Sequence, residues 1–341
     1  MKVSKKLWAW LAAAAVAVSS FATPATSGAA TGDADAITYM ENMYNVMNNA
    51  TSMGMKMDVN VDYSYSGMAG TLKLNADVLS DLATESVKAT VALDLGTLGS
   101  MAVGQSTLNE EVYAIKDGDK YTIYTYDSSS KKWSKDSQEG SQLDSVTSSY
   151  LTNPMDNLDN LKIVSASQNV AGVDCVVVYG EITGETLSAE IQKQQKSTYA
   201  VYDKEIKKCK KQEKKIKKSI KKASKAKKKI YKDQLKSVKQ TRKTYQTLLK
   251  DQKKSNSKLC KALAEGEPVK YNFSIDKATN APVQIQLDVN GFLKSYLAAS
   301  GDDEISDVIQ NCNIVITYYN INQPVNITVP SEALNATDSL L

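Results

Sequence analysis

A lysine-rich stretch, residues Glu190–Ala262, constrains the fold more than any other part of this sequence. It holds 27 of the chain's 42 Lys and Arg residues and six of its 38 acidic residues, and it contains neither Gly nor Pro. Its net charge is therefore +21, whereas the remainder of the chain, with 15 basic and 32 acidic residues, carries −17. The overall net charge of +4 conceals two oppositely charged parts.

The composition of this stretch predicts helix, because Lys, Gln, Ala, Leu and Glu dominate it and all have high helix propensity. Apolar residues recur at steps of three and four, the spacing of helices that pack against each other. In the first half they are Tyr199, Tyr202, Ile206, Cys209, Ile216, Ile220 and Ala223. In the second half they are Tyr231, Leu235, Val238, Tyr245, Leu249 and Leu259. Four polar residues interrupt this seam: Glu213, Arg242, Gln252 and Asn256.

The seam loses its phase at Ser224–Lys229, so the pattern fits either one long helix or a helical hairpin. If Val173–Ile182 and Val269–Ile275 are neighbouring strands, the two ends of the insertion must lie close together, which favours the hairpin. Each arm would then have about 35 residues and a length of roughly 50 Å.

Lysines crowd the polar face of the first arm at spacings of three and four residues. Each such pair costs about 0.2–0.5 kcal/mol, a penalty that salt or a polyanion would relieve. The functional interpretation is contact with teichoic acid, acidic phospholipid headgroups or extracellular nucleic acid, through diffuse attraction rather than bidentate recognition. Single-stranded nucleic acid is not favoured, because no aromatic residues alternate with these lysines. Sequence-specific nucleic acid is not expected either, since lysine gives diffuse attraction. The residues concerned are Lys207, Lys208, Lys210, Lys211, Lys214, Lys215, Lys217, Lys218, Lys221 and Lys222.

The alternative is that the lysines form a solvated spacer, or contact the acidic part of the same or another copy of the chain.

Residues 1–30 have the organisation of a secretory signal peptide. Three lysines precede the apolar run Leu7–Val18, and small residues up to Ala30 allow cleavage. Twelve apolar residues are few for a membrane span, and no other run is long enough. We therefore expect an exported chain, extracellular or associated with the cell envelope, without a transmembrane segment after cleavage.

The sequence contains no histidine, which excludes Ser-His-Asp and Cys-His catalysis and His-dependent zinc sites. No phosphate-binding Gly loop or nucleophile elbow is present either. The acids Asp58, Asp62, Asp77 and Asp94 follow only the alternation of strands and are interpreted as solvated surface. We predict a protein that is not an enzyme and that has no cofactor and no metal.

Export permits disulfides, and four cysteines allow three pairings. We favour Cys175–Cys312, since both lie in strand-like runs. The alternative is that all four are buried, unpaired thiols.

The clearest strand is the alternation of apolar and polar residues from Met55 to Tyr65, which predicts an antiparallel sheet with one apolar and one polar face. Further strands are predicted at Leu72–Val78, Val87–Leu95, Val112–Lys116, Tyr121–Asp127, Leu161–Ser167, Val173–Ile182, Val269–Ile275, Val283–Val289, Asn313–Ile321 and Val325–Val329. Helices are predicted after Asp33, with Thr38 and Glu41 at capping-box spacing, and at Ser141–Leu151 and Gly291–Ala299.

Outside the basic insertion, the chain resembles the bacterial lipoprotein-carrier-like (Lol-type) proteins and their Gram-positive secreted and lipoprotein relatives. The resemblance covers roughly residues 35–185 and 268–330. It rests on three stretches, AITYMENMYNVMNNATSMGMKMDVNVDYSY, EVYAIKDGDKYTIYTYD and YNFSIDKATNAPVQIQLDV. It implies an open half-barrel lidded by helices, whose apolar cavity holds acyl chains or lipoproteins in characterised members. The chain departs from that pattern in lacking the lipid-anchor cysteine of the Gram-positive relatives and in carrying the insertion.

The expected fold class is α+β, with a strongly curved antiparallel sheet (an open half-barrel), short covering helices and an inserted long Lys-rich helical hairpin. The expected domains are a signal peptide (1–30), the half-barrel (31–185 and 266–330), the hairpin (186–265) and a C-terminal tail (331–341).

The apolar face of the first three strands is either the wall of a ligand cavity or a fully packed core. Methionine suits a cavity for adaptable apolar ligands. As a concave cavity wall it would comprise Met55, Met57, Val59, Val61, Tyr63, Leu72, Leu74, Val91 and Leu93.

Two hypotheses about function follow. In the first, the chain is an exported, non-enzymatic binding protein that holds a lipid-like ligand on its sheet and contacts a polyanionic surface through its hairpin. In the second, it is a structural or interaction protein whose hairpin seam, including Ile206, Ile216 and Ile220, pairs with another copy or with a partner.

Overall fold

The chain forms two compact units. The first comprises residues up to Thr183, Pro268–Lys294 and the residues from Asp303 onward, and it contains the sheet. The second comprises Gly184–Glu267 and Ser295–Asp302 and contains two long helices. This computed structural model describes residues 30–65, 68–96, 106–128, 130–139, 158–300 and 309–336. The predicted signal peptide, up to residue 29, and the predicted helix at Ser141–Leu151 lie outside these ranges.

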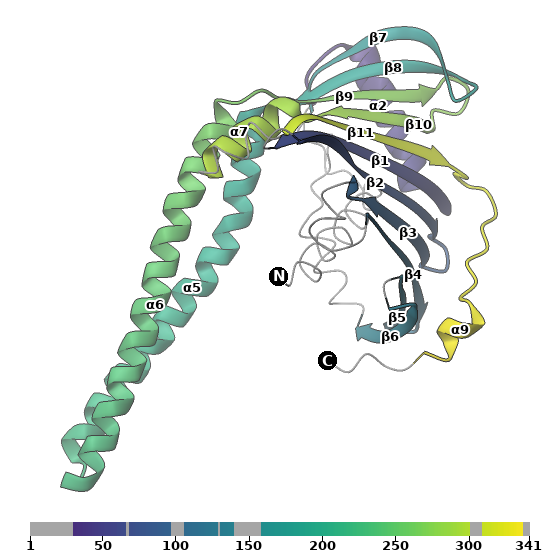
Figure 1. Cartoon of the computed structure of the whole chain (residues 1–341). Helices are drawn as coiled ribbons and strands as arrows, with labels where there is room; N and C mark the ends of the chain where they lie inside the picture. Colours follow the sequence, from purple (N-terminus) through teal and green to yellow (C-terminus); the bar gives the residue numbers. More distant parts are fainter. Residues whose placement is uncertain are drawn as a thin grey trace. The chain divides into compact units, whose positions relative to one another are not determined.

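Eleven strands form one antiparallel sheet in the order β6-β5-β4-β3-β2-β1-β11-β10-β9-β8-β7. The sheet curves strongly between its two edge strands, β7 and β6, and does not close (Figure 1). This confirms the predicted α+β fold with an open half-barrel. The strands are β1 (Ser52–Tyr65), β2 (Met68–Asp81), β3 (Ser86–Asp94), β4 (Thr107–Asp117), β5 (Lys120–Asp127), β6 (Lys132–Glu139), β7 (Asp159–Val170), β8 (Val173–Ile182), β9 (Val269–Asp276), β10 (Pro282–Asp288) and β11 (Ile309–Tyr319).

Strand register gathers the apolar residues of the sheet on one side. Met57 lies opposite Ile316 of β11 and Ala76 of β2, and Ala76 lies opposite Val91 of β3. Because successive side chains alternate between faces, each strand contributes every second residue to this side. We call it the apolar face; on β1–β3 its members are Met55, Met57, Val59, Val61, Tyr63, Leu72, Leu74, Ala76, Val78, Val91 and Leu93.

Helix α2 (Ala34–Asn48) covers part of the apolar face. It lies against β7 and β8. Burial is the main cause that raises the pKa of the Tyr44 hydroxyl, and the nearby Tyr318 and Tyr271 raise it further. The buried residues of α2 are Ala36, Met40, Met43, Tyr44 and Met47.

The predicted capping box of α2 is wrong. Thr38 lies inside the helix and its hydroxyl donates to Ala34 O at 2.9 Å, while Asp33 occupies the N-cap position. Spacing alone placed the cap one turn too late.

The opposite side of the sheet, the polar face, carries the C-terminal segment at one end. Tyr113 and Tyr124 are buried there against Ala333 of helix α9 (Ser331–Leu334), with Ile327 and Val329 packed beside them. The predicted strand Val325–Val329 is therefore wrong, because this segment between Pro324 and Pro330 packs across a sheet face and does not pair with an edge. The start of the predicted C-terminal tail forms α9, whose Ala333 packs against Tyr113 and Tyr124. Strand β6, which contains Trp133, was not predicted from the sequence.

The basic insertion is a helical hairpin, as favoured from the sequence. Helix α5 (Gly184–Lys222) and helix α6 (Lys225–Ala264) run side by side and are joined at Ala223–Ser224 (Figure 1). Their far ends meet, since a Cβ on Gly184 would lie 1.9 Å from Leu263 O. The strands that flank the insertion, β8 and β9, are neighbours in the sheet, and Val178 lies opposite Phe273. Helix α7 (Asn290–Ser300) matches the predicted helix at Gly291–Ala299.

The predicted disulfide Cys175–Cys312 is wrong. All four cysteines are free and buried. Cys175 lies on β8 and Cys312 on β11, with β9 and β10 between them. Three strand spacings amount to roughly 14 Å, whereas the Cα atoms of a disulfide lie within about 7 Å of each other.

Candidate functional site

The ten lysines predicted to bind polyanions all lie on α5, and all ten are exposed. Within the described part of the chain, Lys208 alone among them has an ion pair, with Glu205 Oε1 at 2.5 Å. The other nine ammonium groups meet water. The structure therefore gathers these charges on one helix and leaves them uncompensated.

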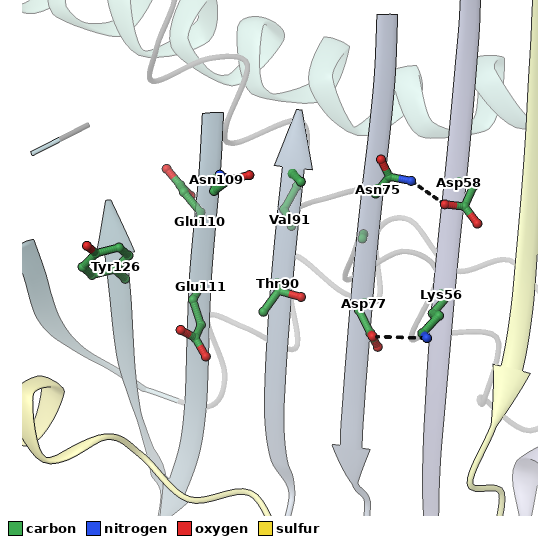
Figure 2. Close-up of a pocket in the computed structure, with 12 residues that line it drawn as sticks. Lys56, Asp58, Asn75, Asp77, Thr90, Val91, Asn109, Glu110, Glu111 and Tyr126 are labelled. Atoms are coloured by element: carbon green, nitrogen blue, oxygen red, sulfur yellow. Dashed lines mark hydrogen bonds and ion pairs between the residues drawn. The ribbon is translucent and has the colours of Figure 1, made fainter. Parts of the chain in front are cut away.

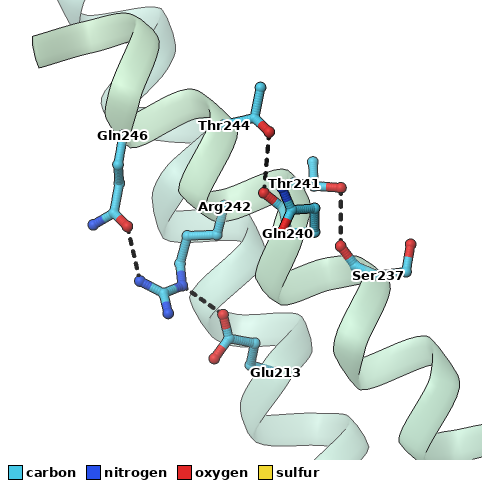
Figure 3. A network of polar contacts seen from close by, with 7 residues as sticks. All are labelled: Glu213, Ser237, Gln240, Thr241, Arg242, Thr244 and Gln246. Atoms are coloured by element: carbon cyan, nitrogen blue, oxygen red, sulfur yellow. Dashed lines mark hydrogen bonds and ion pairs between the residues drawn. The ribbon is translucent and has the colours of Figure 1, made fainter.

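The hairpin's few acids do not neutralise this surface, because its most buried acid is used in the seam. Glu213 lies between the helices, and its Oε1 accepts a hydrogen bond from Arg242 Nε at 2.5 Å (Figure 3). Arg242 Nη1 also donates to Gln246 at 3.0 Å, which fixes the guanidinium. Two of the polar interruptions seen in the sequence are thus partners in one buried ion pair.

Apolar contacts close the seam on the side of this pair that is far from the turn. Ile206, Cys209 and Leu249 are buried, and the rings of Tyr202 and Tyr245 meet at 6.3 Å. The seam is thereby satisfied within one chain, and the lysines are directed to the outside of the hairpin.

Lysines make the turn of the hairpin strongly cationic, and the dipoles of the two helices act on these lysines in opposite ways. Lys221 and Lys222 in the last turn of α5 are favoured by the negative end of its dipole. The first turn of α6 has no acid, although Lys225 and Lys227 lie at its positive end. These two lysines face an unfavourable dipole, so the turn is a place where bound anions would be stabilising.

All nine residues of the predicted cavity wall lie on the apolar face. Met55, Met57, Tyr63, Val91 and Leu93 are buried. The remaining four, Val59, Val61, Leu72 and Leu74, are half-buried and adjacent, since Val59 pairs with Leu74 and Val61 with Leu72. The half-buried block is a continuous apolar surface across β1 and β2.

A carboxyl group lies at the margin of this apolar face. Glu110 of β4 lies opposite Val91 on one side and opposite Asp127 on the other. Burial, and secondarily the charge of Asp127, raises the pKa of Glu110 to about 7. Sequence analysis did not identify Glu110. The pattern that could have done so is an acidic residue at the strand position between Leu108 and Val112, on the same side as these two apolar residues.

The polar face holds an open trough of about 510 Å³ that crosses β1 to β5 (Figure 2). Its carboxylates on β1 and β2, Asp58 and Asp77, are occupied by neighbouring groups. Asp58 accepts from Asn75 at 2.5 Å, and Asp77 accepts from the Tyr319 hydroxyl and lies 4.0 Å from Lys56 Nζ. These acids serve cross-strand pairing, in line with their interpretation as surface.

Within the described residues, no cluster of His, Cys, Asp or Glu is arranged to hold a metal ion. In the same ranges, no helix combines the length and apolarity needed to cross a membrane.

These features define an α+β protein of the open half-barrel class, with a polycationic helical hairpin inserted between two adjacent strands. No protein-family model matches the sequence. A search of curated proteins likewise gives no match.

The comparison with solved structures gives two matches at low similarity. The Mycobacterium tuberculosis lipoprotein LppX is 11% identical, with a TM-score of 0.38 over 87% of this chain and 100% of LppX. A DUF1329 family protein from Desulfovibrio piger is 7% identical, with a TM-score of 0.24 over 86% of this chain and 94% of that protein. At this distance neither structure identifies a family or an activity.

Proposed function

We propose that this chain is an exported, non-enzymatic binding protein of the bacterial cell envelope. Its Lys-rich hairpin binds a polyanionic polymer or membrane surface, and the apolar face of its sheet accommodates a lipid-like ligand. The observation that carries the proposal is the row of ten exposed lysines on α5, of which only Lys208 has an acidic partner in the described residues.

The physical basis is relief of repulsion. Ammonium groups three and four residues apart destabilise the helix that carries them, and a polyanion offsets this by placing negative charge along the row. Such contacts release counterions, so affinity falls steeply as salt increases. Lysines without a bidentate geometry favour a repetitive, flexible anion such as a poly(glycerol phosphate).

The lipid half of the proposal is supported by the half-buried block Val59, Val61, Leu72 and Leu74. An apolar surface of this kind gains free energy when an acyl chain removes it from water, at roughly 25 cal/mol per Å². Met55 and Met57 border it and can repack around ligands of different shape.

The polymer contact is tested by comparing two triple variants of the full chain with equal net charge. K214Q/K217Q/K221Q removes three exposed lysines from α5, and K73Q/K120Q/K131Q removes three exposed lysines from the sheet unit. Binding to poly(glycerol phosphate) is measured from 50 to 300 mM NaCl. We expect the α5 variant to reduce the slope of log K against log salt by roughly 2, about 0.7 for each lost contact, and the control to leave it unchanged. Equal effects of the two variants would refute a hairpin site.

The lipid contact is tested by native mass spectrometry of the full chain after incubation with phospholipid vesicles. We expect a bound-lipid mass for the natural sequence and a lower occupancy for L74W, whose larger ring occupies the half-buried block. A chain without bound lipid, or an occupancy that L74W leaves unchanged, would contradict this half of the proposal.

A second candidate function, self-association, is favoured by Val201, Ile230 and Leu248, which are exposed on the hairpin. Because Ile206 is buried in the internal seam, these outer residues would have to form the contact. Sedimentation tests it: a concentration-dependent dimer that V201D/L248D abolishes supports association, and a monomer at all concentrations excludes it.

A further inference from the structure

A second polar site lies within the hairpin, close to the ends of the helices that are far from the turn. Here α5 and α6 leave a groove of about 500 Å³ between them. The groove is separate from the row Lys207–Lys222, and none of those ten lysines lines it. Its polar lining residues are Ser188, Gln192, Gln195, Lys196, Tyr199, Lys253, Asn256, Ser257 and Lys261.

The groove exists because the seam changes character. Toward the middle of the hairpin, Ile206, Cys209 and Leu249 close the space between the helices. In the groove, amide and hydroxyl side chains occupy positions where a coiled-coil seam would otherwise place apolar residues. Such residues reduce helix pairing energy, so their concentration at one level of the hairpin calls for a function other than packing.

Hydrogen bonds preorganise the lining. The Tyr199 hydroxyl donates to Gln195 Oε1 at 3.1 Å and accepts from Asn256 Nδ2 at 2.7 Å, which links the two helices. Gln192 Nε2 donates to Ser188 Oγ at 3.3 Å. Lys253 Nζ lies 5.3 Å from the centre of the Tyr199 ring, where the face of the aromatic ring attracts the cation.

The groups that remain for a ligand are mostly donors. The Gln195 oxygen already accepts from the Tyr199 hydroxyl, whereas Asn256 uses one of its two amide N–H groups on Tyr199. Lys196 and Lys253, both exposed, also line the groove. No carboxylate lines the groove among the described residues. Lys261 has an acidic neighbour, Glu265, at 3.9 Å, but both side chains are exposed and such a pair is weak.

From this arrangement we propose that the groove binds a single phosphate ester, such as a glycerol phosphate unit. Three lysines, an amide N–H and a hydroxyl match the charge and the acceptor oxygens of a phosphate. The volume falls within the range of small-molecule sites, roughly 300–1,000 Å³, and so leaves room for the esterified alcohol. The free metabolite, a polymer repeat and a lipid headgroup share this chemistry.

The site differs in kind from the row of lysines on α5. The row attracts any extended polyanion, whereas the groove offers a fixed set of donors to one anionic group. The groove should therefore show saturable one-to-one binding that persists at physiological salt, at which diffuse attraction is screened.

The test titrates the full chain with glycerol 1-phosphate at about 150 mM NaCl, an ionic strength that screens exposed charges beyond roughly 8 Å, by isothermal titration calorimetry. K196Q/K253Q removes two groove lysines, and K214Q/K217Q removes two lysines of the exposed row, so the two variants have the same net charge. We expect the groove variant to weaken binding about tenfold or more, as for the loss of charge-assisted contacts, and the row variant to leave it unchanged. Non-saturable heat, or equal weakening by both pairs, would overturn the proposal.

Y199F provides a second, conservative variant. It keeps the ring beneath Lys253 but removes the hydroxyl that orients Asn256, and it should weaken binding several-fold while the helical circular dichroism stays unchanged. Unchanged affinity in Y199F would show that the hydrogen-bonded lining has no role in binding, contrary to the proposal.

Three further titrations distinguish the source of the phosphate once binding is found. Binding of glycerol 1-phosphate alone supports a free metabolite as the ligand. Binding of poly(glycerol phosphate) that K196Q/K253Q weakens supports a polymer repeat. Binding of phosphatidylglycerol vesicles that the same variant weakens supports a lipid headgroup. Loss of polymer binding in K214Q/K217Q/K221Q, together with glycerol 1-phosphate binding that K196Q/K253Q leaves unchanged, would leave the proposed polyanion function standing and refute the groove site.

Discussion

Removing the carboxylate of Glu213 should destabilise the hairpin far more than removing any exposed acid from the same helix. The side chains of Glu213 and Arg242 are only 10% and 23% exposed, and their atoms meet at 2.5 Å. Removing one partner of a buried ion pair costs about 3–5 kcal/mol, because the other charge stays buried without compensation. Partial exposure of Arg242 reduces this, so we expect E213A to lower the free energy of unfolding by about 2–3 kcal/mol.

The chain contains a matched control in Glu205, which pairs with Lys208 on the surface of the same helix. E205A and E213A remove the same carboxylate, gain the same helix propensity and raise the net charge by the same amount. General repulsion among the lysines is therefore equal in the two variants. Because Lys208 is largely exposed, the loss of stability in E205A should be much smaller than that in E213A.

Urea unfolding followed by circular dichroism at 222 nm measures this, since α5 and α6 contain most of the helical residues that the structure describes. The double variant E213L/R242L replaces both charges by seam-filling apolar residues and should recover most of the loss, or exceed the natural stability. If E213A lowers the free energy of unfolding no more than E205A does, or if the double variant is as unstable as E213A, an unpaired Arg242 charge does not destabilise the hairpin.

Three further predictions concern the sheet unit. The pKa of Glu110 is raised to about 7, so the stability that its protonated form provides is complete below the ordinary pKa of the group and is lost as pH rises through 7. E110Q should remove this pH dependence in thermal melts from pH 5 to 8. At pH 8 it should be about 1–2 kcal/mol more stable than the natural chain, a value already reduced for the partial exposure of the carboxylate. G54A should cost about 1–3 kcal/mol, because a Cβ would lie 2.4 Å from the Tyr319 ring, and an unchanged melting temperature would contradict that packing. Cys175 and Cys312 should resist a thiol reagent in the folded chain, because both are buried and have raised pKa values, and four thiols should react after unfolding without reductant.

Local sequence patterns predicted most of the secondary structure correctly. The alternation from Met55 to Tyr65 placed β1 and assigned its apolar face, because side-chain direction along a strand has a fixed period of two. The helical character of the insertion followed from composition and from the three-and-four spacing of its seam, and the hairpin from the expected pairing of the two strands that flank it. The predictions failed where a local pattern had two outcomes, as at Thr38, which could cap a helix or bond within one.

Long-range contacts account for the other errors. Val325–Val329 has the composition of a strand, but its residues Ile327 and Val329 pack against Tyr113 and Tyr124. The strand that precedes it, β11, already has a neighbour on both sides. The cysteine pairing required the number of strands between β8 and β11, which no local pattern contains.

By itself, the sequence determined most of the helices and strands, the apolar side of the predicted strands, and the separation of a +21 stretch from a −17 remainder. These properties follow from the periodic direction of neighbouring side chains and from composition. Only the tertiary structure decided that Glu213 meets Arg242, that Glu110 lies beside Asp127, and that polar residues at the far ends of α5 and α6 enclose a groove. Each of these depends on which residues distant in the chain are brought together, and that is set by strand order and helix pairing rather than by any local pattern.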